Sequence, residues 1–145
     1  MRTDIARRLL LVAACLALAA CNPAATGAAP GSASSASLTG REWRLVELGG
    51  RPAGAGAQDR AATLRLEEGR ASGFAGCNRF FGGYQADGSR LTFSALGATR
   101  MACDQGMQLE RDYLAALEAT RTFRLTPQGL ELLGESGVLA RFAAA

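Results

Sequence analysis

The sequence predicts an α+β domain, mostly antiparallel β, in which a small sheet or barrel of short strands carries one packed helix over about residues 104–121. Short runs with alternating apolar residues occur both before and after that segment. Within the segment the apolar spacing changes to the helical period. Turns containing Gly or Pro separate the runs, so neighbouring strands are expected to connect as hairpins.

Four short strands are predicted before the helix, each an alternating apolar run bounded by turn residues. They span residues 42–48, 62–67, 71–75 and 90–94. In the first of them, Trp43 and Leu45 alternate onto one face. Residues 51–60 are rich in Gly and Ala and predict a loop.

The helix is predicted because five apolar side chains fall within roughly 160° of a helical wheel. They are Met107, Leu109, Tyr113, Leu114 and Leu117. Asp104 is the expected N-cap. Glu110 lies inside the apolar arc, where a carboxylate is out of place. Three short strands follow as a meander, at residues 122–126, 130–133 and 138–142.

Residues 1–20 predict an export signal. Three Arg and one Asp occupy residues 1–8, and residues 9–20 are uncharged and apolar. As a helix those twelve residues would span about 18 Å, too little for a hydrocarbon core of about 30 Å. A charged start followed by a short apolar core is typical of a secretory signal peptide.

Leu18-Ala19-Ala20-Cys21 closes this segment and resembles the lipobox of bacterial lipoproteins. The resemblance implies a diacylglyceryl group on the Cys21 sulfur and cleavage before Cys21. An ordinary secretory signal that happens to contain a cysteine is the alternative. Asn22 follows, and by similarity favours the outer membrane. We expect a protein that is lipid-anchored in the cell envelope, at the outer membrane and facing the periplasm.

Residues 22–37 carry no charge and no residue larger than Asn. Such a segment buries too little apolar area to fold, so residues 21–37 are expected to be the lipidated cysteine and a disordered tether. The folded domain is expected at residues 38–142.

Composition excludes several classes of function. The formal net charge is +3, of which the leader holds +2, so no basic surface for a nucleic acid is implied. Histidine is absent, which removes the commonest general base and the commonest metal ligand. We therefore predict no metal, no cofactor and no nucleic-acid partner.

Two motifs distinguish the domain: GCNRFFGGY at residues 76–84 and TRMAC at residues 99–103. Their order and spacing, followed by a helix carrying Glu110, resemble the META-domain family, which includes the HslJ-like heat-shock lipoproteins. The motif positions that match are Gly76, Asn78, Arg79, Phe80, Gly82, Tyr84, Thr99, Arg100 and Met101. The resemblance implies a compact, mostly antiparallel β domain with one helix and no established catalytic activity.

Cys77 and Cys103 are the thiols that remain once Cys21 is lipidated and Cys15 leaves with the leader. In an oxidising envelope, two thiols in a small domain favour a disulfide. It would stabilise the fold by roughly 3.5 kcal/mol in the chain-entropy model. Two buried free thiols, or a metal site that would lack ligands, are the alternatives.

The remaining motif residues suggest structure more than chemistry. Four glycines, at positions 73, 76, 82 and 83, are expected in positive-φ turns, because the Lys of a phosphate-binding loop is missing. Asn78 is expected to bond local backbone at such a turn. Arg79 and Arg100 are expected to pair with carboxylates or face solvent, with an anionic partner as the alternative.

Five aromatic residues cluster in sequence: Phe74, Phe80, Phe81, Tyr84 and Phe93. They are expected in the core and against the helix. An apolar groove for a lipid or a partner strand is the alternative, and the exposure of Phe81 distinguishes the two.

The function expected is that of a non-enzymatic envelope lipoprotein with a META domain, monomeric, which binds a protein or lipid partner in envelope stress tolerance or assembly. A protein inhibitor of a cell-wall-degrading enzyme, similar to lysozyme inhibitors, is the alternative. An enzyme is disfavoured because no His exists to activate a Ser and both mature thiols are expected to be bridged.

Overall fold

Nine antiparallel strands form one sheet in the computed structural model, which describes residues 38–145. The strand order is β2-β1-β3-β4-β5-β6-β7-β8-β9, and β9 also pairs with β1, so the sheet returns on itself as a ring. The strands are β1 (Glu42–Leu48), β2 (Arg51–Pro52), β3 (Thr63–Glu67), β4 (Arg70–Phe74), β5 (Arg79–Asp87), β6 (Arg90–Ala98), β7 (Thr122–Thr126), β8 (Gly129–Gly134) and β9 (Gly137–Ala144). The helical elements are the short 3₁₀ helix η1 (Ala57–Asp59) and the helix α2 (Met107–Ala119).

The predicted α+β class is wrong. Strands make up 52% and helices 16% of the described residues, and the strands belong to one ring-like sheet rather than a small sheet of short strands. The error arises at β5, which was not predicted. Gly82 and Gly83 were expected in turns, yet they lie inside this nine-residue strand. Its partner β6 is also nine residues long, where a strand ending at residue 94 was predicted.

The helix is present but starts later than predicted, at Met107 instead of residue 104. Its N-cap is Gly106, with a left-handed φ of +91°, so the predicted cap at Asp104 is wrong. Packing explains the difference. A Cβ at position 106 would lie 2.1 Å from the carbonyl oxygen of Gly76, so only glycine fits where the helix begins.

The strands away from the motifs follow the sequence pattern closely. Those predicted at residues 42–48 and 122–126 have the observed bounds of β1 and β7. The other predicted strands before the helix and in the final meander occur with shifted ends. Trp43 and Leu45 are both buried on the predicted face, and the indole N–H of Trp43 donates to the carbonyl of Leu38 at 2.9 Å.

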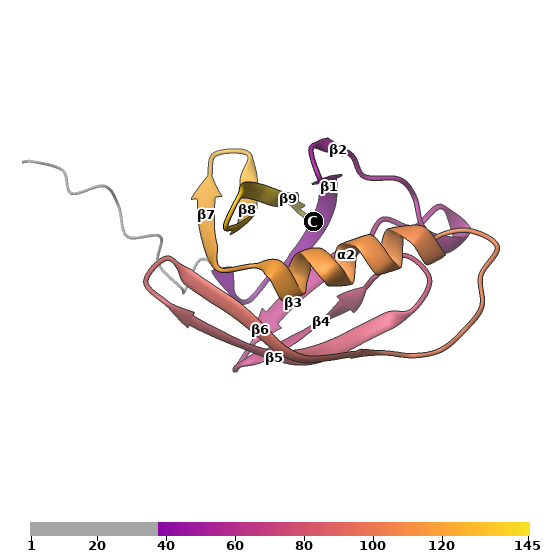
Figure 1. Cartoon of the computed structure of the whole chain (residues 1–145), viewed down its shortest axis with the longest axis horizontal. Helices are drawn as coiled ribbons and strands as arrows, with labels where there is room; N and C mark the ends of the chain where they lie inside the picture. The colour runs from indigo at the N-terminus through magenta and orange to yellow at the C-terminus, as the bar shows by residue number, and fades with distance from the viewer. Residues whose placement is uncertain (1–37) are drawn as a thin grey trace, which may run out of the picture.

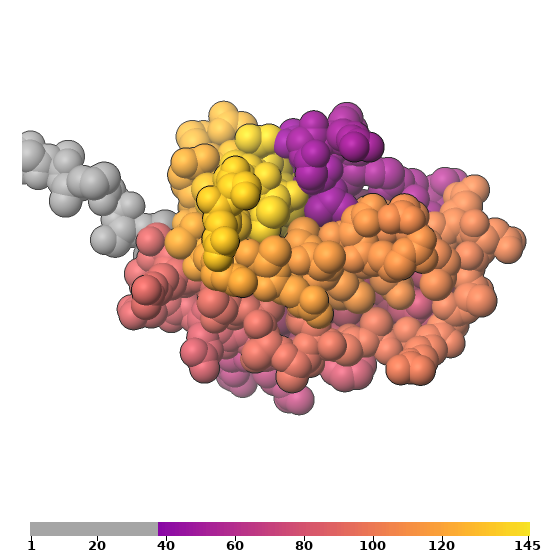
Figure 2. Space-filling model, viewed as in Figure 1, coloured from indigo at the N-terminus to yellow at the C-terminus, as the bar shows by residue number. Residues whose placement is uncertain are grey.

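The helix α2 lies across the ring, between the β1–β9 side and the long strands β5 and β6 (Figure 1). Figure 2 shows its residues at the surface between these two parts. On its inner side, Tyr113 is fully buried and meets Phe80 edge-on, with ring centroids 5.7 Å apart. The Tyr113 hydroxyl donates to the carbonyl oxygen of Thr63 at 3.1 Å. One tyrosine therefore joins the helix to both the core and β3.

The ring is weakest between β6 and β7, where the register contains a single pair, Arg90 with Thr122. The helix α2 packs against β6 and also against β8, β9 and β1. It therefore covers the side on which β6 and β7 diverge.

The predicted export signal, Cys21 and the tether lie outside the described residues. Within residues 38–145, no helix is long and apolar enough to cross a membrane.

Candidate functional site

Asn78 is the centre of the motif residues. Its side chain is buried, and its main-chain N–H donates to Oε2 of Glu110 at 2.6 Å. The amide Nδ2 donates to Oε1 of Glu110 and to the carbonyl of Met101, each at 3.1 Å. The amide Oδ1 accepts from the N–H of Met101 at 2.7 Å and from the hydroxyl of Thr99 at 3.1 Å. The predicted local turn bond is therefore wrong, because this side chain joins distant segments.

These contacts explain Glu110, which is out of place in the apolar arc of the helix and was not predicted as a site residue. The carboxylate is buried in the first turn of α2 and accepts both hydrogen bonds from Asn78. A carboxylate near a helix N-terminus is also favoured by the helix dipole. The feature of the sequence that could have identified Glu110 as a site residue is its position inside the apolar arc of the helix.

The predicted disulfide is confirmed: Cys77 and Cys103 are bridged, with Cα atoms 5.9 Å apart. The bridge holds the TRMAC segment against the start of β5. The sulfur of Cys77 also lies 3.3 Å from the carbonyl oxygen of Met101. Because a bridged sulfur carries no proton, this is a packing contact and not a hydrogen bond.

Of the four glycines predicted in positive-φ turns, only Gly76 has this conformation, with φ +128°. Its carbonyl accepts from the N–H of Ala57 at 2.7 Å and lies where a Cβ of Gly106 would be. The prediction is wrong for Gly73, Gly82 and Gly83, which lie within strands. Close packing explains Gly82, because its Cβ would meet a methyl carbon of Leu96 at 2.7 Å.

These contacts join three separate segments of the chain. We call the residues that make them the latch, namely Asn78, Glu110, Thr99, Met101 and the Cys77–Cys103 bridge. Both polar atoms of the Asn78 amide bond within the protein. The latch fixes the helix start and the TRMAC segment relative to β5. The role of these bonds is to hold the fold together.

The aromatic residues divide into two groups. Phe80 lies in the core, while Tyr84 and Phe93 pack against it. Phe74 is buried under the guanidinium of Arg60, which lies 4.1 Å from its ring centroid. Phe81 differs from them, because 58% of its surface is exposed. The core prediction therefore holds for Phe74 and Phe80, holds in part for the half-buried Tyr84 and Phe93, and is wrong for Phe81.

Arg79, Arg100 and Met101 are exposed, Met101 by 61%. None of the ion pairs within residues 38–145 involves Arg79 or Arg100. Both are therefore available to solvent or to an anionic partner.

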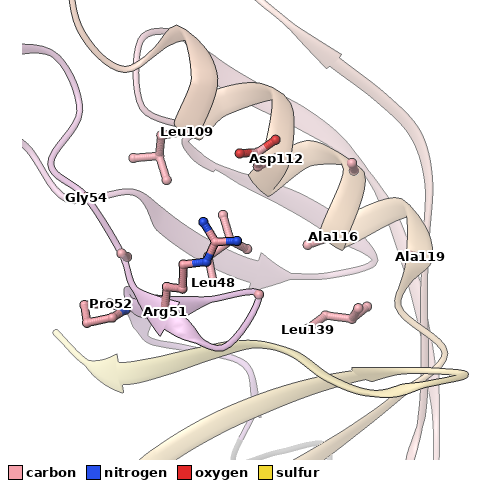
Figure 3. A pocket seen from close by; sticks show the side chains of 12 residues that line it. Leu48, Arg51, Pro52, Gly54, Leu109, Asp112, Ala116, Ala119 and Leu139 are labelled. Atoms are coloured by element: carbon pink, nitrogen blue, oxygen red, sulfur yellow. The ribbon is translucent and has the colours of Figure 1, made fainter.

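A groove of about 610 Å³ lies between α2, the β1–β2 hairpin and β9 (Figure 3). Its apolar walls include Leu48, Leu109 and Leu139, and Arg51 and Asp112 supply opposite charges. Figure 3 shows Arg51 extending from the hairpin and Asp112 lying on the helix. This groove was not predicted from the sequence, although the small residues Ala115, Ala116 and Ala119 along one side of the helix were a signal.

Three ionisable groups within residues 38–145 have shifted pKa values, and all three belong to the framework. The carboxylates of Glu131 and Glu47 raise the pKa of the Arg141 guanidinium. Burial raises the pKa of the Tyr113 hydroxyl. Burial also acts to raise the pKa of Glu131, but hydrogen bonds and charges from Arg141 and Arg124 outweigh it and lower that pKa. Because Arg141 pairs with Glu47 as well, this network joins β1, β8 and β9.

The comparisons with known proteins place this geometry in a family. The sequence profile of the META domain family matches residues 36–145. The chain belongs to the META domain family. The predicted resemblance is confirmed, and the latch is built from the META motif residues.

Two solved structures resemble this META domain. One is an NMR structure of a protein from Burkholderia xenovorans, 31% identical, covering 86% of this chain and 97% of that chain, with a TM-score of 0.61. The other is an NMR structure that is 24% identical, covering 76% of this chain and 93% of its own, with a TM-score of 0.60, and it shows the fold alone. No curated protein matches this chain.

Proposed function

We propose that this META-domain protein is a non-enzymatic lipoprotein of the cell envelope. It is anchored in the outer membrane through the lipid on Cys21, faces the periplasm, and binds a partner in envelope stress tolerance or assembly. The observation that carries the binding role is the groove between α2, the β1–β2 hairpin and β9.

The groove has the size and walls of a binding site. A volume of about 610 Å³ lies within the range of about 300–1,000 Å³ typical of ligand sites. The leucine walls suit an apolar occupant. An anionic lipid headgroup would meet Arg51 but would also be repelled by Asp112. A segment of a partner protein can present a carboxylate to one and a donor to the other, so the occupant we propose is a short apolar protein segment.

The engagement of the reactive groups supports a non-enzymatic protein, because the groups named below already form bonds within the fold. The thiols of Cys77 and Cys103 are consumed in a disulfide. The tyrosine with a raised pKa, Tyr113, donates its proton to a backbone carbonyl in the core. The carboxylate with a lowered pKa, Glu131, is paired with two arginines.

Site-specific photo-crosslinking in intact cells tests the groove. A benzophenone side chain replaces Ala115, which lines the groove, or Glu118, which is exposed on the same helix and does not line it. We expect one defined crosslinked protein from position 115 and none from position 118. Equal products from both positions, or none from either, would contradict the proposal. A crosslinked cell-wall-degrading enzyme would favour the inhibitor alternative instead.

The anchor is tested separately. The variant Cys21→Ala should lose palmitate labelling and should leave the outer-membrane fraction. Unchanged labelling would show that Cys21 is not the lipidated residue.

A further inference from the structure

Phe81 stands at the centre of the outer face of β4, β5 and β6. Its opposite residues are Ser72 on β4 and Gly97 on β6. Along β5, alternation places Arg79 and Gly83 on the same face, two positions away. Small residues therefore adjoin Phe81 on three sides, which leaves this residue 58% exposed.

The ring has a defined position on this face. Its Cε2 atom would lie 3.2 Å from a Cβ at position 97, so the aromatic ring rests over the glycine backbone of β6. An aromatic side chain that covers a cross-strand glycine is a stabilising arrangement in sheets. The Phe81 ring therefore already has a fixed position, so a contact with it would cost little conformational entropy.

Arginines lie beside this aromatic residue on β5 and on its β3–β4 side. The register places Arg70 opposite Gly83, Arg65 opposite Ser72, and Arg79 opposite Phe74. The guanidinium of Arg60 lies over the ring of Phe74. All four arginines are exposed. We call these four arginines, together with Phe81 and the small residues around it, the Phe81 face.

Positive charge is concentrated on this face. Glu67 lies directly opposite Arg70, and its carboxylate bonds the guanidinium of Arg65 at 3.1 Å. Arg60, Arg70 and Arg79 have no partner among the ion pairs within residues 38–145. The chain beyond the leader carries thirteen Arg against twelve Asp and Glu, so this excess is local.

We propose that the Phe81 face docks on an anionic phospholipid bilayer. An exposed aromatic residue within a basic rim matches the interface between headgroups and acyl chains. The ring enters the apolar boundary, and the arginines pair with lipid phosphates. The choice of a membrane over an acidic protein rests on the proposed function, in which a lipid on Cys21 keeps the domain beside a bilayer. Such tethering raises the effective concentration, so weak docking is enough.

Tryptophan quenching in vesicles tests the proposal. The lipidated full-length mature protein is reconstituted in vesicles of brominated phosphatidylethanolamine and phosphatidylglycerol, or of brominated phosphatidylcholine alone. Phe81→Trp adds a reporter to the buried native Trp43. Val46→Trp is the matched control, because Val46 is also exposed, by 42%, but lies on β1.

In anionic vesicles we expect the added indole of Phe81→Trp to shift to the blue and to be quenched, and that of Val46→Trp to be unaffected. Phosphatidylcholine vesicles or 0.5 M salt should reduce the quenching several-fold. Adding Arg70→Gln to Phe81→Trp should weaken docking about fivefold, whereas adding Arg111→Gln, on the helix, should not.

Equal quenching of both tryptophan variants, no quenching of either, or no dependence on lipid charge would overturn the proposal. Flotation of the protein with the vesicles reports the anchor, while quenching reports the Phe81 face. Failure of the anchor and failure of the docking surface are therefore distinguishable.

Discussion

Asn78 and Glu110, 32 positions apart in the sequence, are joined by two hydrogen bonds. The backbone N–H of Asn78 and its side-chain amide each donate to a different oxygen of the Glu110 carboxylate, at 2.6 and 3.1 Å. One acidic side chain thus connects the start of β5 with the first turn of α2. Both residues are buried, so breaking either bond would leave a polar group with little access to water.

The variant Glu110→Gln should be destabilised by about 1–3 kcal/mol, because one of the two donors of Asn78 would face an NH₂ group instead of an oxygen. Urea unfolding measures the loss. Glu118→Gln, an exposed change on the same helix, is the control and should stay within about 0.5 kcal/mol of the wild type. Equal stability of Glu110→Gln and the wild type would show that the carboxylate is not needed as a double acceptor.

Loss of the Cys77–Cys103 bridge should destabilise the domain by about 3.5 kcal/mol, because the unfolded chain regains the freedom of a loop with a sequence separation of 26. The measurement is chemical unfolding of the wild type and of the double variant Cys77→Ser/Cys103→Ser. Alkylation under denaturing conditions provides the check on the bridge itself. Two thiols modified at these positions in unreduced protein would contradict it.

The start of the helix should tolerate only glycine at position 106. Gly106→Ala combines a left-handed φ of +91° with a Cβ placed 2.1 Å from the carbonyl oxygen of Gly76. We expect a loss well above the roughly 1–2 kcal/mol that a left-handed conformation alone costs. Gly88→Ala separates the two effects, because Gly88 has a φ of +56° with nothing within 4 Å. Equal losses in the two variants would mean that the close approach to Gly76 does not matter.

Tyr113 should make the fold sensitive to alkaline pH. Burial raises the pKa of its hydroxyl, so the folded state keeps a proton that the unfolded state loses above about pH 10. Stability should therefore fall above pH 10, by at most about 1.4 kcal/mol per pH unit.

The variant Tyr113→Phe tests this sensitivity. It should lose about 1 kcal/mol at neutral pH with its bond to Thr63, and should lack this alkaline contribution. Tyr84→Phe leaves Tyr113 in place and should keep the slope. Urea unfolding between pH 7 and pH 11.5 measures both, and an unchanged slope in Tyr113→Phe would contradict the assignment.

The fold was predictable where local pattern decides the structure. The alternation of Trp43 and Leu45 and the helical spacing of Tyr113 and Leu117 correspond to buried faces. Prediction failed at β5, where two consecutive glycines resemble a turn. Cross-strand contacts decide that segment, since Gly82 is needed to admit Leu96 and not to reverse the chain. Such contacts depend on the register of distant segments, which a single sequence does not display.

The latch was predictable only in part. The disulfide follows from counting thiols, whereas the partner of Asn78 lies on the helix and requires the tertiary structure. Glu110 was recognised as out of place, but its role depends on a donor pair that the sequence alone does not locate. The groove depends on the spacing between α2 and the β1–β2 hairpin, which no local pattern specifies.

The pairing of β1 with β9 sets an order of events for folding. Trp43 lies opposite Ala144, so the ring closes through a contact between nearly the first and nearly the last described residues. Forming such a contact carries a large loop-closure entropy and slows the reaction. The chain therefore cannot complete its sheet until its final strand is available. In the exported lipoprotein that we propose, such a delay would keep the chain unfolded and able to pass through a translocation channel until β9 is available.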